Sequence, residues 1–232
     1  MAIYKGNKKV VAVYKGSIPY NKIYKGSTLV FQKSGGGGST HLFEGTATGY
    51  FDLEINRITI HITPDASGKW FFDTDEKITI LNSAFNRQTK VTSVDLSNLD
   101  LTGISTSAMF YRASEITSIK FNNTKSMKLV AVVNMFNGCS SLTSLNLSSF
   151  DTSSLTSANG LFGGCTSLET LDLSNFDLSN ASSYNGMFNN CTKLSTIKCK
   201  QAFKDWCITN QDTILLPTAM REGGSGTWEI VG

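Results

Sequence analysis

Histidine, proline and charged residues are scarce in this sequence of 232 residues, which limits the kinds of catalytic and metal site that it can form. It holds two histidines, His41 and His61, and three prolines, and charged residues make up 17%. Neither histidine lies near a carboxylate cluster, and no Cys-x-x-Cys pair or nucleophile motif occurs. Metal-dependent and nucleophilic catalysis depend on such groups. The sequence therefore predicts no catalytic residue, no metal site and no cofactor, and a protein that is not an enzyme.

Long apolar runs are also missing. No stretch approaches the length of a membrane span, and Met1 to Lys9 carries lysines and a glycine in place of the apolar core of a secretory signal. No cysteine near the start suits a lipid anchor. We therefore expect no membrane insertion and no export signal in this sequence.

A repeat with a fixed step is the strongest feature present. Phe136, Phe162 and Phe188 lie 26 residues apart, and each opens a Phe-x-x-Cys segment. Apolar positions of the form L-x-x-L-x-L follow each segment, and looser copies precede the first one. These apolar sets are Val91/Val94/Leu96, Ile116/Ile119/Phe121, Leu142/Leu145/Leu147, Leu168/Leu171/Leu173 and Leu194/Ile197/Cys199.

A period in the twenties with this leucine pattern is typical of leucine-rich repeats. One strand cannot bury its apolar face alone, whereas stacked copies bury a continuous one. The sequence thus predicts an α/β solenoid, a leucine-rich repeat of about five 25/26-residue turns over residues 81–200. In each turn a strand is expected on one wall, and the Met-Phe-x-x-Cys segment is expected to form a turn of helix on the other.

The same residues resemble a known family. The pattern Met-Phe-x-x-Cys-x-Ser-Leu-x-x-Leu-x-Leu-Ser-x-Phe-Asp runs from Met135 through Asp151 and again from Phe162 through Asp177. It is similar to the BspA-type leucine-rich repeats shared with mycoplasma surface lipoproteins. That resemblance implies a surface protein used in adhesion and host contact, although one fold serves many functions.

Five cysteines are an odd number, so they cannot all form disulfides. Cys139, Cys165 and Cys191 recur in register, and we expect buried, reduced thiols. A bond between Cys199 and Cys207 stays an open alternative. A second column, made of Asp100, Asp151 and Asp177, is expected to cap turns, with calcium binding as the alternative.

Residues 1–33 form a basic arm with seven lysines and no acidic residue. Tyr-Lys-Gly recurs there every ten residues between short β-prone runs. We expect an anchor that docks on a larger protein surface; a solvated tail and a nucleic-acid arm are the alternatives. The arm resembles N-terminal segments of some bacteriophage structural proteins. The residues expected to bind the partner are Tyr4, Lys5, Tyr14, Lys15, Tyr24 and Lys25.

The remaining segments connect and close the repeats. Residues 34–40 contain four glycines in succession and read as a flexible linker. Residues 41–80 alternate with period two and predict a β-hairpin cap at the N-terminal end. Residues 201–232 predict a C-terminal cap with a helix, whose apolar face holds Phe203, Trp206 and Cys207, and an edge strand over 227–231.

The outward strand positions of the repeats form a polar ribbon without aromatic anchors, so contacts of the body are expected at loops and edges. Tyr111, Arg112 and Tyr184 are the candidate contact residues, with filling of the wall as the alternative.

Together these features favour a non-enzymatic structural and binding protein of a bacteriophage virion, as a head or tail fibre or decoration. The arm would bind other virion proteins, and the body would contact a host surface protein or glycan. The alternative is a BspA-like adhesin on a bacterial cell surface. A homo-oligomer stays open, and nucleic acid is disfavoured because the arm holds no arginine.

Overall fold

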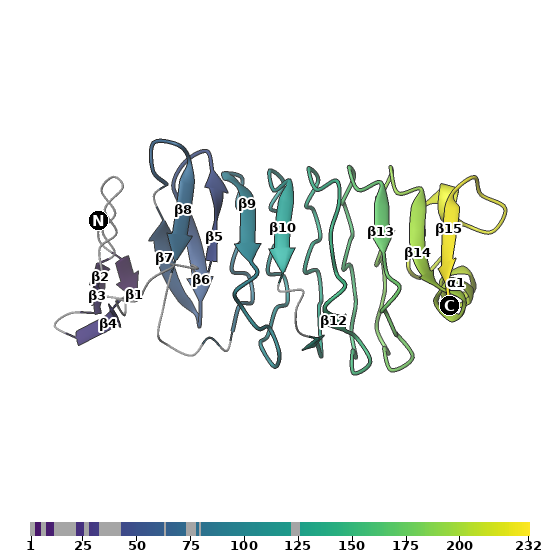
Figure 1. Cartoon of the computed structure of the whole chain (residues 1–232), viewed down its shortest axis with the longest axis horizontal. Coiled ribbons are helices and arrows are strands. Elements are labelled where there is room, and N and C mark those ends of the chain that lie inside the picture. The colour runs from purple at the N-terminus through teal and green to yellow at the C-terminus, as the bar shows by residue number, and fades with distance from the viewer. Residues whose placement is uncertain are drawn as a thin grey trace.

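The computed structural model describes residues 3–5, 8–11, 22–25, 28–32, 43–62, 64–72, 78, 80–121 and 126–232. The strands are β1 (Ile3–Lys5), β2 (Lys8–Val11), β3 (Lys22–Lys25), β4 (Thr28–Gln32), β5 (Phe43–Ala47), β6 (Phe51–Ile55), β7 (Ile58–Ile62), β8 (Lys69–Phe72), β9 (Val91–Leu96), β10 (Ser118–Phe121), β11 (Met127–Lys128), β12 (Phe150–Asp151), β13 (Thr170–Asp172), β14 (Thr196–Lys200) and β15 (Thr227–Val231). One α-helix, α1 (Gln201–Thr209), and one 3₁₀ turn (Thr218–Met220) complete the described elements. Figure 1 shows the elements following one another along the long axis, with β1–β4 and β15 at opposite ends.

The predicted α/β leucine-rich repeat solenoid is wrong. Within the described residues the strands fall into five small sheets, and the single α-helix comes after the last repeat. No described repeat alternates a helix with its strand. The strand expected in each turn is also not formed in every repeat, because Leu142 to Leu147 carries the leucine pattern without forming a strand.

The hydrogen bonds of the Phe-x-x-Cys wall explain why it holds no helix. The amide N–H of Phe136 donates to the carbonyl of Leu161 in the next repeat, at 3.0 Å. Its neighbours Met135 and Asn137 donate three residues back, to Val132 and Asn134. An α-helix needs every amide to donate four residues back within its own segment. Since alternate amides are used between repeats, the segment becomes a series of tight turns.

These turns need two left-handed residues in each repeat. The first position is occupied by Ser83, Ala108, Asn134, Gly160 and Gly186, and the second by Arg87, Arg112, Gly138, Gly164 and Asn190. Their φ angles lie between +53° and +82°. Glycine suits this region best, and Gly164 also sits where an added Cβ would lie 3.3 Å from the backbone of Gly138.

The interior of the repeats is a column of stacked phenylalanine rings. Neighbouring rings are 5.2 to 6.0 Å apart between centroids, with interplanar angles of 17° or less, through Phe85, Phe110, Phe136, Phe162 and Phe188. All five side chains are fully buried. Because a ring at the same place in each repeat meets its copies above and below, the 26-residue step is enforced by packing as well as by backbone hydrogen bonds.

At the N-terminal end, β5 closes the edge of the first repeat. It pairs antiparallel with β9 on one side and with β8 on the other, in the sheet order β10-β9-β5-β8. Gly45 permits this approach, since a Cβ there would collide with the carbonyl of Ser93. Next to this sheet, β6 and β7 form an antiparallel hairpin through Asn56 and Arg57, both at positive φ, as turns matched to the twist of a hairpin require.

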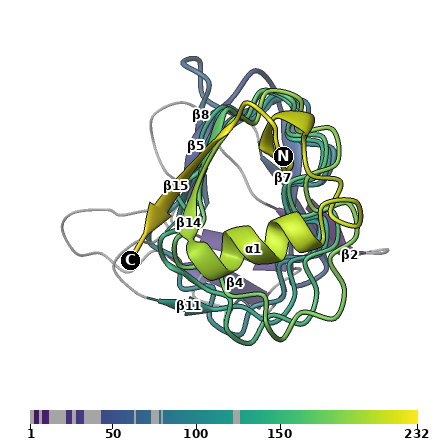
Figure 2. The same ribbon diagram turned by 90° about the vertical axis from the view of Figure 1, so that its right-hand side faces the viewer.

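At the C-terminal end, α1 and β15 cover the last repeat, and Figure 2 shows this end face with α1 crossing it and β15 along one side. Phe203 and Cys207 of α1 are buried, and the Phe203 ring meets Phe176 edge-on at 6.3 Å. Strand β15 pairs parallel with β14 and continues the direction of the repeat strands.

The arm strands β1–β4 form their own antiparallel sheet in sequence order, and β1 lies against β7. The division of the chain at residues 33, 40, 80 and 200 stays a prediction.

Candidate interaction surfaces

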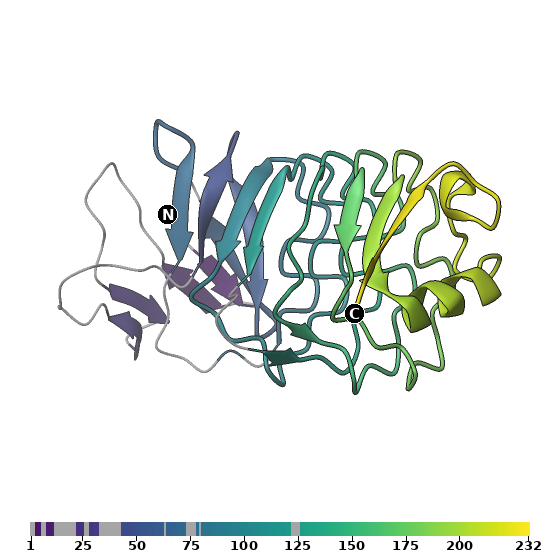
Figure 3. The ribbon, with the colours of Figure 1, turned by 45° about the vertical axis from the view of Figure 1, so that its right-hand side comes forward.

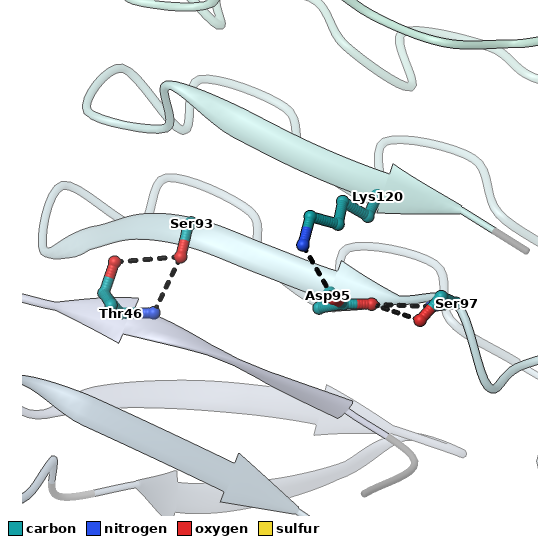
Figure 4. Close-up of polar contacts among 5 residues, drawn as sticks. All are labelled: Thr46, Ser93, Asp95, Ser97 and Lys120. Atoms are coloured by element: carbon teal, nitrogen blue, oxygen red, sulfur yellow. Dashed lines mark hydrogen bonds and ion pairs between the residues drawn. The ribbon is translucent and has the colours of Figure 1, made fainter. Parts of the chain in front are cut away.

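The strand wall carries polar side chains whose groups are largely occupied by one another (Figure 4). The Thr46 amide of β5 donates to Ser93 Oγ at 2.9 Å, and the two hydroxyls are 2.8 Å apart. Lys120 Nζ lies 3.4 Å from Asp95 Oδ2, and the Ser97 hydroxyl and amide donate to Asp95 Oδ1. Burial tends to raise the pKa of Asp95, but the Ser97 and Lys120 contacts outweigh it and leave the pKa below its usual value.

The same arrangement returns three repeats later. Lys198 Nζ lies 2.9 Å from Asp172 Oδ2, and Asp172 Oδ1 accepts the Ser174 amide. The sequence places each lysine 25 or 26 residues after its aspartate, so the pairs link adjacent repeats. Such exposed pairs contribute little to stability, because solvent screens them. The two aspartates of this wall that bind a lysine are therefore already satisfied.

The aspartates after the strands cap turns, as the sequence predicts. The amides two residues later, those of Thr102, Ser153 and Ser179, donate to Asp100, Asp151 and Asp177 at 2.8 to 3.0 Å. Hydrogen bonds from Ser153 and Ser179 lower the pKa of Asp151 and Asp177. No group of three or more potential metal-ligating side chains occurs among the described residues. The alternative of calcium binding by these aspartates therefore has no support in the structure.

The cysteine column faces the interior. Each thiol donates to the carbonyl of a phenylalanine in the preceding repeat, at 3.0 to 3.2 Å, for Cys139, Cys165 and Cys191. Burial raises the pKa of Cys139 and Cys191 to about 12. Cys199 and Cys207 are also buried free thiols. A thiolate is needed for nucleophilic or metal chemistry, so these sulfurs act as apolar packing groups.

The three body residues expected to make contacts are not brought together into one site. Arg112 is exposed and its guanidinium carbon lies 5.1 Å from the Tyr111 ring centroid. Tyr184 instead packs edge-on against Trp206 at 4.9 Å and hydrogen-bonds Asn210. Tyr111 and Arg112 thus present a surface pair, whereas Tyr184 helps to hold α1 on the last repeat.

In the arm, the structure describes the backbone of four of the six expected partner-binding residues. Tyr4 and Lys5 belong to β1, and Tyr24 and Lys25 belong to β3. Tyr14 and Lys15 lie outside the described residues. The arm's role in binding stays a prediction.

A cleft beside the C-terminal cap is a feature that the sequence reasoning missed. Its volume is about 500 Å³, and it lies between α1, the loop after the 3₁₀ turn and β15, lined in part by Lys204, Asp205, Glu222 and Trp228. Arg221 is fixed at its side, with Nη1 2.6 Å from Asp212 and Nε donating to the Leu216 carbonyl. The only sequence signal was the gathering of a tryptophan, glycines and acids over residues 221–229.

Among the described residues, no helix is both long and apolar enough to cross a bilayer.

Comparison with known families gives one result. Residues 105–214, slightly less than half of the chain, match the family described as Mycoplasma protein of unknown function, DUF285. That family is related to BspA-like surface repeat proteins, so the similarity lies in the repeats and not in the arm. No curated protein and no solved structure matches the chain.

Proposed function

We propose that the chain is a non-enzymatic structural and binding protein of a bacteriophage virion. Residues 1–33 anchor it in the particle, and the repeats project outward to contact a surface or receptor. The observation that carries this proposal is the hydrogen bond that recurs from repeat to repeat along the turn wall, from Phe85 to Met109 through Phe188 to Ile214, at 2.7 to 3.0 Å. Backbone bonds and a continuous aromatic column make a stiff spacer, because each repeat is held by both neighbours.

The surface chemistry supports display rather than catalysis. The described thiols are buried, and the aspartates of the strand wall are already paired with serine hydroxyls, amides or lysines. The arm and the rest of the chain differ in charge: seven lysines and no acidic residue occupy residues 1–33, and the rest of the chain holds 14 basic and 18 acidic residues. A cationic end suits attachment to an acidic protein surface.

The body contact is proposed at Tyr111 and Arg112, because aromatic and arginine side chains dominate binding energies at protein interfaces. The repeats supply a matched variant. Asn137 and Asn189 occupy the Tyr111 position, and Asn190 occupies the Arg112 position at the same φ of +57°. Tyr111→Asn with Arg112→Asn therefore removes the contact pair and keeps the turn.

A second function is a BspA-like adhesin on a bacterial cell surface. The similarity of residues 105–214 to the mycoplasma family favours it. The two proposals differ in where the chain is found and in what residues 1–33 do.

The test measures where the chain is found when the arm keeps its lysines and when they are replaced by glutamine. Three versions of the chain are produced in a phage-producing host. They are the full chain, an arm variant with Lys5→Gln, Lys15→Gln and Lys25→Gln, and a control in which exposed body lysines are changed, with Lys90→Gln, Lys128→Gln and Lys193→Gln. Particles are purified by density gradient, and the chain is measured in particles and on the cell surface. The virion proposal expects incorporation that the arm variant loses and the control keeps. Incorporation that survives deletion of residues 1–33 removes the anchor, and recovery on cells without particles supports the adhesin.

A further inference from the structure

The cleft beside the C-terminal cap has an apolar floor that includes an aromatic ring. Figure 3 shows its three segments together at this end of the molecule, namely α1, the loop after the 3₁₀ turn and β15. Trp228 and Ile208 line the cleft, and both are partly buried against the core. The Trp228 Nε1–H donates to the Met220 carbonyl at 3.2 Å, which holds the indole in place. A ligand in the cleft therefore meets a fixed aromatic ring beside an aliphatic side chain.

The cleft also carries polar groups that the chain leaves available. Lys204 and Glu222 line it, and neither side chain forms a hydrogen bond or an ion pair with another described residue. Asp205 Oδ1 accepts a hydrogen bond from Gln201 Nε2 at 2.7 Å, so its second oxygen is open to a ligand. The aspartates of the strand wall differ, because lysines and serines already occupy them. The cleft thus offers a donor and acceptors beside an aromatic ring.

The loop that forms one wall of the cleft is held in a tight turn. The Gly224 amide donates to the Arg221 carbonyl at 2.9 Å, and the Gly226 amide donates to the Ala219 carbonyl at 2.6 Å. A Cβ at Gly224 would collide with the carbonyls of Thr218 and Ala219, so this close approach of two backbones requires glycine. Because the wall is already ordered, binding a ligand against it loses less conformational entropy.

Charge and size exclude several classes of ligand. Lys204 and Arg221 balance Asp205 and Glu222 in the lining, and the Arg221 guanidinium is already bonded to Asp212. A phosphate or another anion would face two carboxylates and one free ammonium group, and like charges disfavour its binding. A metal ion lacks ligands, since no group of three potential ligands occurs among the described residues. Ten residues line the cleft, whereas a stable protein interface needs about 20–30 on each side.

An uncharged sugar meets each of these conditions. One face of a hexose ring carries C–H groups, which pack on the electron-rich face of an indole. The sugar hydroxyls donate to carboxylates and accept from an ammonium group, and hydrogen bonds to charged groups are the stronger ones. The volume of about 500 Å³ lies within the range of small-molecule pockets and accommodates roughly one or two sugar rings.

We propose that this cleft binds a neutral saccharide, with Trp228 stacking on the sugar ring and with Lys204, Asp205 and Glu222 bonding its hydroxyls. The inference goes beyond the body contact proposed above, since it adds a second site and gives the chemical class of its ligand. It holds for a virion protein and for an adhesin alike.

Binding is measured by NMR on the full chain, with a panel of neutral sugars as the probes. The panel consists of the methyl glycosides of glucose, galactose, mannose, N-acetylglucosamine and N-acetylgalactosamine, and of lactose, maltose, cellobiose and diacetylchitobiose, each up to about 10 mM. At least one sugar is expected to bind with a Kd of about 1 mM or below. It should shift the indole N–H signal of Trp228 and leave that of the buried Trp70 unchanged. Since the ligand is uncharged, its affinity should be the same at low salt and at about 0.5 M salt.

Three variants remove the binding groups one at a time, and circular dichroism checks that each is folded. Trp228→Leu keeps an apolar side chain without the aromatic ring, whereas Glu222→Gln and Lys204→Met each remove a charge. Each variant is expected to weaken binding about tenfold, through loss of the ring contact or of a hydrogen bond to a charged group. Glu229→Gln and Lys200→Met are the matched controls, because both residues are exposed and neither lines the cleft. Both controls should bind as the wild type does.

Failure of every sugar in the panel to bind overturns the inference, as does a sugar that binds equally well to Trp228→Leu. If that variant does not fold, the two charge variants and their controls decide in its place. Inorganic phosphate that binds more tightly than any neutral sugar, or sugar binding that is lost at high salt, reveals an ionic site and also overturns the inference. Incorporation into particles by a chain that binds no sugar leaves the proposed function standing and removes only this inference.

Discussion

Truncation of the central ring of the phenylalanine column tests how the repeats hold together. Phe136 is fully buried, stacks on Phe110 at 5.8 Å and on Phe162 at 6.0 Å, and meets Phe121 edge-on at 6.1 Å. Burial of a phenylalanine contributes about 1.5–3 kcal/mol, and each ring contact adds about 0.5–1.5 kcal/mol. Allowing for partial collapse of the cavity, Phe136→Ala should lower the free energy of unfolding by about 4 kcal/mol.

The column also predicts a difference between its centre and its end. Phe188 is equally buried but has one ring contact among the described residues, with Phe162 at 5.6 Å. Phe188→Ala should therefore cost about 1 kcal/mol less than Phe136→Ala. Phe136→Leu, which keeps most of the buried volume, should cost about 1–2 kcal/mol.

Urea unfolding followed by circular dichroism measures these costs, and an unchanged slope with urea shows that the same surface unfolds in each variant. Equal losses for Phe136→Ala and Phe188→Ala would refute the contribution of ring stacking. A loss below about 2 kcal/mol for Phe136→Ala would refute the column as the core of the repeats.

Three further predictions concern the backbone, the acids and the thiols. Gly164→Ala and Gly103→Ala meet the same strain, at φ +72° and +71°, which costs each about 1–2 kcal/mol; Gly164→Ala should lose more than Gly103→Ala, because only at Gly164 does the new Cβ approach another backbone, and equal losses in urea unfolding would contradict the packing argument. Hydrogen bonds from Ser153 hold the pKa of Asp151 below its usual value, so its stabilisation is present at neutral pH and is lost as pH falls through that lowered pKa. Acid titration of Asp151→Asn should therefore show a smaller fall in stability below about pH 4, and an unchanged profile would contradict it. The five buried thiols should resist a water-soluble thiol reagent at pH 8 and react fully in urea; rapid labelling of the folded protein would show that they are accessible.

The sequence reveals which residues share a column better than it reveals backbone conformation. The 26-residue step aligns Phe110, Phe136 and Phe162, and packing requires copies of one residue to meet when repeats lie in register. The left-handed turns are hidden because their positions carry Ala108 and Arg112 in one repeat and glycines in others. A short apolar segment with this composition reads as a helix until the direction of each amide is known.

The surfaces were harder to foresee than the core. Tyr111 and Arg112 sit at a turn, as a loop position implies, but the contact of Tyr184 with Trp206 joins residues 22 apart and depends on how α1 folds back. The edge strand over 227–231 follows from its β-branched residues, and the structure places it there as β15.

The shared step of the ring column and the backbone bonds has a consequence for how such a chain can change over time. Duplication or loss of one whole unit, for example residues 135–160, leaves every ring facing a ring and every amide facing a carbonyl. The body would lengthen or shorten by about 4.8 Å, the spacing of neighbouring strands, while both ends stay as they are. A partial unit would shift the rings out of alignment. The length of the body is therefore adjustable only in whole increments, by gain or loss of complete repeats.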